Sequence, residues 1–126
     1  MKWEEENLQI RCVNFLTYRY SHLLWNHSPN EGKRTERQGA YLKKMGMQTG
    51  WPDLDIIDKD LAVHVEFKTM KGRQSPEQKK MQARIQEQGH CYYICRSYEE
   101  FVDICHKHFG PERDPDLEQL RKILGQ

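Results

Sequence analysis

The sequence has no long hydrophobic run. Its apolar segments are a few residues long, far short of the roughly 18 residues that a membrane span needs. We also expect no signal peptide, because the first residues are acidic and no apolar segment follows them. With 126 residues there is room for one domain and little more. We therefore expect a cytoplasmic protein with no membrane partner.

Net charge is nearly absent as well, since 20 Lys and Arg residues balance 19 Asp and Glu residues to +1. The total hides an uneven distribution. Residues 1–32 carry three basic and four acidic residues, residues 33–84 carry twelve and seven, and residues 85–126 carry five and eight. The basic middle segment favours contacts with phosphate groups. Its candidate cations are Lys33, Arg34, Arg37, Lys43, Lys44, Lys71, Arg73, Lys79, Lys80 and Arg84, although some of them are expected to be ordinary solvated side chains.

The four cysteines, Cys12, Cys91, Cys95 and Cys105, do not indicate disulfides in a cytoplasmic protein, where thiols stay reduced. A zinc site that also uses His108 is an alternative. However, Cys91 and Cys95 fall in a strand-like segment that would separate them by about 13 Å, too far to share one ion. We therefore favour buried thiols.

Helices are predicted from apolar spacing and from capping signals. Thr35 with Gln38, and Ser75 with Gln78, form capping-box pairs, and Ser97 with Glu100 forms a third. The expected helices begin at residues 4, 35, 75, 97 and 115. The first is expected to end at residue 24, the second near Gly46 and the third at Gly89, and the last to pack through Leu117, Leu120 and Leu124.

Strands are predicted at residues 25–27, 54–57, 61–68 and 91–95. The segment 61–68 alternates clearly, with apolar residues on one face and His64, Glu66 and Lys68 on the other. Residues 58–60 read as a hairpin turn before it. The helix between this strand and the next predicts a βαβ crossover, so we expect an α/β fold: a small mixed β-sheet flanked by helices on both sides.

Three charged residues form the candidate site. A hairpin would bring Asp53, before one strand, close to Glu66 and Lys68 at the end of the next. Two carboxylates suit Mg²⁺, which can activate a water and neutralise charge on a phosphate. Each residue alone is more often a solvated or turn residue. Asp55 and Asp58 are rival carboxylates that periodicity does not exclude.

The combination resembles a known motif. Pro52-Asp53, followed by Glu66-Phe67-Lys68, is similar to the PD-(D/E)XK nuclease signature. The wider series resembles the VRR-NUC family, the virus-type replication-repair nucleases, over about residues 4–105. It consists of residues 29–34 (PNEGKR), 50–54 (GWPDL), 66–68 (EFK), 72–78 (GRQSPEQ) and Gly89.

The resemblance implies a role for each matched position. Asp53 and Glu66 would bind the metal with the backbone carbonyl of Phe67, and Lys68 would be the catalytic lysine. Gln78 would reach the site from the following helix, unless it serves only as a cap. The first-helix glutamate would be Glu5, followed by Gln9, although Glu4 and Glu6 leave that assignment open by one residue. The expected DNA contacts are Lys33, Arg34, Lys71, Arg73 and Lys79.

The resemblance further implies a restriction-endonuclease-like fold. We expect a nuclease domain at residues 1–109 and a C-terminal helical extension at residues 110–126 that packs on it. The implied activity is Mg²⁺-dependent DNA endonuclease cleavage, with Mn²⁺ as a substitute and no nucleotide cofactor, in a bacterial or phage-infected cell. The expected substrate is branched DNA such as a four-way junction, cut by a homodimer that associates through the first helix or residues 91–95. The alternative is a non-catalytic DNA-binding module with the same fold.

Overall fold

The computed structural model describes residues 2–29 and 35–125. Helices and strands follow one another along the chain in the predicted order. They are α1 (Lys2–Arg19), β1 (Leu24–His27), α2 (Glu36–Lys44), β2 (Leu54–Asp58), β3 (Leu61–Phe67), α3 (Pro76–Glu87), β4 (Cys91–Cys95), α4 (Tyr98–Phe109) and α5 (Leu117–Leu124). In the described residues no helix is both long and apolar enough to span a membrane.

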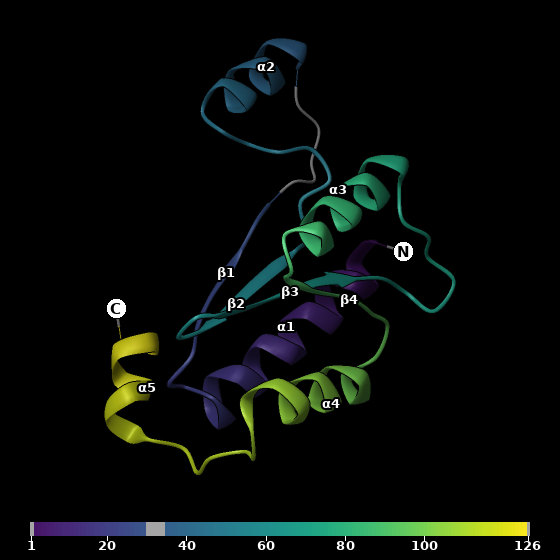
Figure 1. The fold of residues 1–126 in the computed structure, drawn as a ribbon. Coiled ribbons are helices and arrows are strands. Elements are labelled where there is room, and N and C mark those ends of the chain that lie inside the picture. Colours follow the sequence, from purple (N-terminus) through teal and green to yellow (C-terminus); the bar gives the residue numbers. More distant parts are fainter. Residues whose placement is uncertain (1, 30–34, 126) are drawn as a thin grey trace.

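The four strands form one mixed sheet in the order β1-β2-β3-β4. The first three strands are antiparallel, and β4 lies parallel to β3 after the α3 crossover. Figure 1 shows α3 on one face of the sheet and α1 with α4 on the other. This arrangement confirms the predicted α/β fold with helices on both sides.

The central strand β3 is buried on both faces. Its apolar side chains Val63, Val65 and Phe67 have no exposed surface and pack against α1 and α4. The opposite face would be solvated in a half-exposed sheet, but here His64, Glu66 and Lys68 are only 8%, 1% and 7% exposed. The α3 crossover covers this face, as is usual beside parallel strands. Three polar side chains are therefore enclosed in the middle of the protein.

The first helix is shorter than its apolar pattern predicts. It ends at Arg19, not at residue 24, and the chain turns so that Leu23 is still buried at 3% exposure. The turn is fixed by Tyr20, whose hydroxyl donates to the carbonyl of Gly110 at 2.7 Å. Apolar spacing alone could not distinguish a chain reversal after Arg19 from a continued helix, because Leu23 would be buried in both cases.

The two C-terminal helices differ from expectation in detail. Only Leu120 of α5 is buried, whereas Leu117 and Leu124 are 73% and 59% exposed. The N-cap Ser97 of α4 accepts from the backbone N–H of Glu100 as predicted. The carboxylate of Glu100, however, accepts from the N–H of Arg96 instead of the cap residue, so only half of that capping box forms.

The helix α2 begins and ends as predicted but contributes nothing to the core. Thr35 and Gln38 make both bonds of the capping box, and the chain reverses at Gly46, which has a φ of 109°. No residue of α2 is buried, and the helix stands away from the sheet (Figure 1). It is joined to the sheet by the segment 45–53, which leads directly into the candidate site.

Candidate active site

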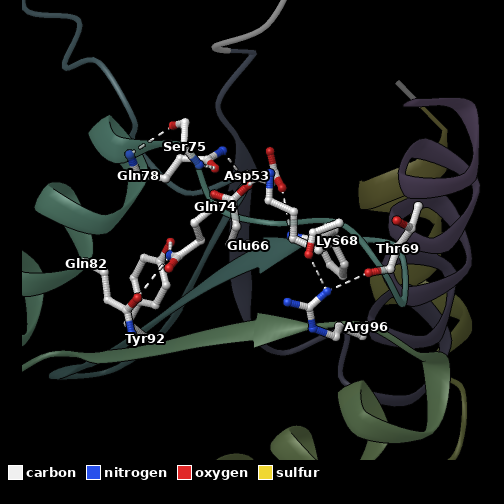
Figure 2. Close-up of polar contacts among 12 residues, drawn as sticks. Asp53, Glu66, Lys68, Thr69, Gln74, Ser75, Gln78, Gln82, Tyr92 and Arg96 are labelled. Atoms are coloured by element: carbon white, nitrogen blue, oxygen red, sulfur yellow. Dashed lines mark hydrogen bonds and ion pairs between the residues drawn. The ribbon is translucent and has the colours of Figure 1, made fainter. Parts of the chain in front are cut away.

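Asp53 and Glu66 lie opposite each other on adjacent strands. Leu54 pairs with Val65 in the β2–β3 ladder, so the next position along each strand brings Asp53 beside Glu66. Asp53 Oδ2 accepts a hydrogen bond from the backbone N–H of Phe67 at 2.8 Å. Because opposed residues in a ladder face the same side of the sheet, the two carboxylates lie on the face that α3 covers (Figure 2).

Glu66 and Lys68 form a buried ion pair on that face. Lys68 Nζ lies 3.7 Å from Glu66 Oε2, and the side chains are 9% and 1% exposed. Burying two charges costs several kcal/mol, and an apolar pair of similar volume is often as stable. The pair is therefore poorly explained as a stabilising contact and better explained as part of a functional site.

Gln78 serves both the helix and the carboxylates. Its Oε1 accepts from the N–H of Ser75 at 2.8 Å, completing the capping box of α3. Its Nε2 donates to Glu66 Oε2 at 2.9 Å (Figure 2). The cap and the contact with Glu66 are both present, because each uses a different end of the amide.

Two glutamates of α1, Glu4 and Glu5, lie beside the site. Glu4 lines a cavity with Lys68. Glu5 is half-buried, with Oε2 near Gly72, and makes no hydrogen bond or ion pair with the carboxylate pair within the described part of the chain. Gln9 Nε2 lies 2.9 Å from Nδ1 of His27, which is 2.8 Å from the carbonyl oxygen of Asp53.

The predicted DNA contacts are placed unevenly. Lys71 and Arg73 are exposed on the loop between β3 and α3, immediately after Lys68. Lys79 is exposed on the first turns of α3, next to Gln78. Lys33 and Arg34 lie outside the described residues. Three of the five predicted DNA contacts are therefore exposed on described segments that adjoin Lys68 or Gln78 in the sequence.

The rival carboxylates are committed elsewhere. Asp55 Oδ1 lies 2.5 Å from Nδ1 of His64, and Trp51 Nε1 donates to Asp55 Oδ2 at 2.9 Å. Asp58 pairs with Leu61 at the hairpin, the opposite end of these strands from Glu66. Neither carboxylate therefore takes the place of Asp53.

The donor atoms fit a hard cation better than zinc. In the described residues no three His, Cys, Asp or Glu side chains are grouped to hold a metal, and this applies to the cysteines and to the Asp53–Glu66 pair alike. Cys12, Cys95 and Cys105 are buried as expected, whereas Cys91 is only half-buried, and burial raises the pKa of Cys105 to about 12, so its thiol stays protonated. Asp53 and Glu66 with a backbone carbonyl match Mg²⁺, which binds through one or two carboxylates and retains waters.

Sequence reasoning missed two further groups around the site (Figure 2). Arg96 Nη1 donates to the carbonyls of Thr69 and Gly72, at 2.6 Å each. The parallel pairing of Phe67 with Cys95 places Arg96 beside Lys68, so a correct strand register would have found it. The second group is a hydrogen-bonded set in which Gln74 Nε2 donates to Gln82 Oε1 and to the hydroxyl of Tyr92.

Tyr92 lies beneath the carboxylates. Its side chain is buried at 7% exposure. Burial first, and then the negative charge of Glu66, raise the pKa of Tyr92, so its hydroxyl stays neutral. Gln74, in the loop that precedes α3, donates to the hydroxyl of this buried ring and to Gln82 of α3. These bonds stabilise the position of the helix that carries Gln78.

The fold is shared with a solved structure. A solved structure described as a "VRR_NUC domain protein" matches with a TM-score of 0.66 and 19% sequence identity, covering 86% of this chain and 95% of that chain. No protein-family model matches the sequence, and no curated protein matches it either. The likeness confirms the fold that the motif resemblance implied.

Proposed function

We propose that this protein is a Mg²⁺-dependent nuclease of the VRR-NUC type that hydrolyses phosphodiester bonds in DNA, with Mn²⁺ able to substitute. The observation that carries the proposal is the buried Glu66–Lys68 pair beside Asp53, in a fold shared with a VRR_NUC domain protein. Such a costly charge arrangement at the end of two strands is typical of a catalytic centre.

Each residue has a distinct role. Asp53 and Glu66, with the Phe67 carbonyl, would hold the ion. When bound, Mg²⁺ supplies a Lewis acid that neutralises charge on the phosphate and lowers the pKa of a water. The Lys68 ammonium would stabilise the negative charge of the transition state. Gln78 fixes the orientation of the Glu66 carboxylate through their 2.9 Å hydrogen bond.

The preferred substrate is proposed to be branched DNA, including four-way junctions. The cations near the site are on a loop and on the start of α3, where they suit the shared phosphate backbone better than base edges. A two-fold homodimer would place two sites on symmetry-related strands. Of the two proposed interfaces, β4 is an edge strand, whereas α1 packs its apolar residues into the core.

The test is a cleavage panel of duplex, flap and four-way-junction DNA, with Mg²⁺, Mn²⁺ or EDTA, beside a measurement of size in solution. Lys68→Ala should lower the rate by roughly 10²- to 10³-fold, the usual effect of losing one group that stabilises transition-state charge. The matched control is Lys107→Ala, because Lys107 is exposed on α4. Lys68→Ala cleaving at the wild-type rate would rule out the proposed site. Metal-independent binding without cleavage of any substrate would indicate the non-catalytic module instead.

A further inference from the structure

A cavity of about 470 Å³ opens beside Lys68. Its walls come from the first turns of α1, from residues 68–71 and from Arg96. Three cations, Lys68, Lys71 and Arg96, line it against one acidic residue, Glu4. A concave site with this excess of positive charge suits an anion, and its volume is within the range of ligand sites in proteins.

Arg96 is held rigidly at this cavity. Its Nη1 donates to the carbonyls of Thr69 and Gly72, at 2.6 Å each, and also lies 3.5 Å from the carbonyl of Met70. A guanidinium carries five N–H donors in a fixed plane, of which these bonds occupy the two on Nη1. The side-chain bonds that Arg96 makes in the described residues leave Nε and Nη2 for other partners.

That arrangement matches phosphate recognition. Guanidinium groups bind phosphate oxygens through two parallel N–H donors, and a group that is already immobilised loses little entropy on binding. Lys71 adds a flexible charge from the same loop. Since Lys68 faces both this cavity and Glu66, an anion bound here would lie next to the proposed reaction centre.

We propose that this cavity binds one phosphate group of a nucleic-acid strand, next to the phosphate that is cleaved, with Arg96 as its principal ligand. The inference rests on the proposed nuclease function and extends it. The phosphate is either an internal diester or the terminal monoester of a strand end, both of which present at least two non-bridging oxygens to Arg96. Arg96 is also a positioning residue for the loop that carries Lys71.

The test must separate phosphate binding from loop support. Binding to a DNA strand is measured in EDTA, so that nothing is cleaved, while phosphates are replaced one at a time by neutral methylphosphonates. In the wild type, one replacement should weaken binding about tenfold, the usual effect of losing a charge-assisted hydrogen-bond pair. In Arg96→Met the same replacement should change binding less than about twofold. Arg121→Met, on the distant α5, should behave as wild type.

Loop support alone would give a different result. Arg96→Met would then weaken binding to every strand by one common factor, and each methylphosphonate would act equally on wild type and variant. That result would overturn the phosphate site. If Arg96→Met does not fold, Arg96→Lys replaces it, because an ammonium can satisfy the loop carbonyls without the planar fork. With Arg96→Lys the same methylphosphonate replacement is then also expected to change binding less than about twofold.

Two further comparisons complete the experiment. Strands with a 5′-phosphate and a 5′-hydroxyl distinguish the sources: a preference that Arg96→Met abolishes assigns a terminal phosphate, and coupling at an inner position assigns a diester. Cleavage in Mg²⁺ is measured separately. If the protein cleaves DNA but no methylphosphonate effect depends on Arg96, the phosphate site is ruled out and the nuclease activity stands. If a methylphosphonate effect depends on Arg96 but no DNA is cleaved, the proposed nuclease activity is ruled out and the phosphate site stands.

Discussion

At the scale of single residues, Gln78 shows how one side chain can satisfy two demands. The cap of α3 needs an acceptor for the Ser75 N–H, and the Glu66 carboxylate accepts a donor. A primary amide has one of each at its two ends. Glutamate, the other residue usual at this capping position, offers acceptors only when ionised. The site therefore favours glutamine for a chemical reason that the capping motif alone does not reveal.

Gln78→Glu is expected to separate the two roles. The new carboxylate can still accept from Ser75 and suits a helix N-terminus, so the melting temperature should stay near the wild-type value. It would face Glu66 with a like charge, so we expect kcat/KM to fall by roughly 10- to 100-fold. Ser75→Ala should do the reverse, with a loss of about 1 kcal/mol of stability and nearly wild-type cleavage. Equal cleavage rates for Gln78→Glu and wild type would show that the Glu66 contact is incidental.

Asp53→Asn tests metal binding without relying on activity. The amide oxygen of asparagine can still accept from the Phe67 N–H, so folding should be little changed, while the charge that attracts a cation is lost. Millimolar Mg²⁺ or Mn²⁺ should raise the melting temperature of the wild type, because a ligand that binds only the folded state stabilises it. We expect this rise to shrink or vanish in Asp53→Asn.

The matched control for this metal effect is Asp103→Asn, which removes an exposed carboxylate from α4. It should keep the full metal-dependent rise. A rise of the same size in Asp53→Asn would mean that divalent cations bind elsewhere on the protein, and the assignment of Asp53 as a ligand would then be wrong.

At the scale of secondary-structure elements, Gly50 controls how closely the loop before β2 approaches α3. Its φ is 81°, and a Cβ atom there would lie 2.5 Å from the carbonyl oxygen of Glu77. Both facts exclude a side chain: the first strains the backbone, and the second is a clash with a helix that cannot easily move. The contact fixes the segment leading to Asp53 against the helix that carries Gln78.

Gly50→Ala should therefore lower both stability and activity. We expect a loss of about 2–4 kcal/mol in the free energy of unfolding, together with slower cleavage, since Asp53 would move relative to Gln78. Gly39→Ala is the matched control. It lies in α2 with nothing within 4 Å of the added Cβ, so it should stabilise that helix slightly. Chemical denaturation of both variants, with cleavage assays, measures the contrast.

Local signals in the sequence predicted most elements because their causes are local. The Thr35 and Ser75 caps and the alternation in β3 depend on residues a few positions apart. The errors have distant causes. The end of α1 depends on the bond from Tyr20 to Gly110, some 90 residues away. The role of Arg96 likewise depends on parallel pairing between β3 and β4.

At the scale of the whole molecule, the candidate site could be anticipated in part. Asp53, Glu66 and Lys68 share one face once the hairpin is assumed, and the structure places them together. Their burial could not be predicted from the period-two pattern, which is the same for a solvated face and for one beneath a helix. The sequence also could not exclude Asp55 as the carboxylate of the site, because the partner of Asp55 is His64 on the next strand.

Two partly buried histidines should make the whole fold sensitive to acid. Burial lowers the pKa of His22 and of His108. Nδ1 of His22 is buried with no hydrogen-bond partner among the described residues, and His108 is hydrogen-bonded to the hydroxyl of Tyr93. The Asp58 carboxylate partly opposes this shift at His22, but burial is the larger effect on the pKa of both rings. Both rings are therefore expected to be neutral in the folded protein at neutral pH.

The sign of the pH effect follows from these lowered pKa values. The unfolded chain, with histidine pKa values near 6.5, binds more protons than the folded protein just below that pH. The free energy of unfolding should therefore be highest above pH 6.5 and fall as the pH decreases from 7 to 5. Glu112 adds to the fall below about pH 4.5, since its hydrogen bond with His106 lowers its pKa.

In urea denaturation at successive pH values, the double variant His22→Gln, His108→Gln should show a shallower slope between pH 7 and 5. Gln86→Ala, exposed and non-titrating, should keep the wild-type slope; a double variant that also keeps it would place the acid sensitivity elsewhere.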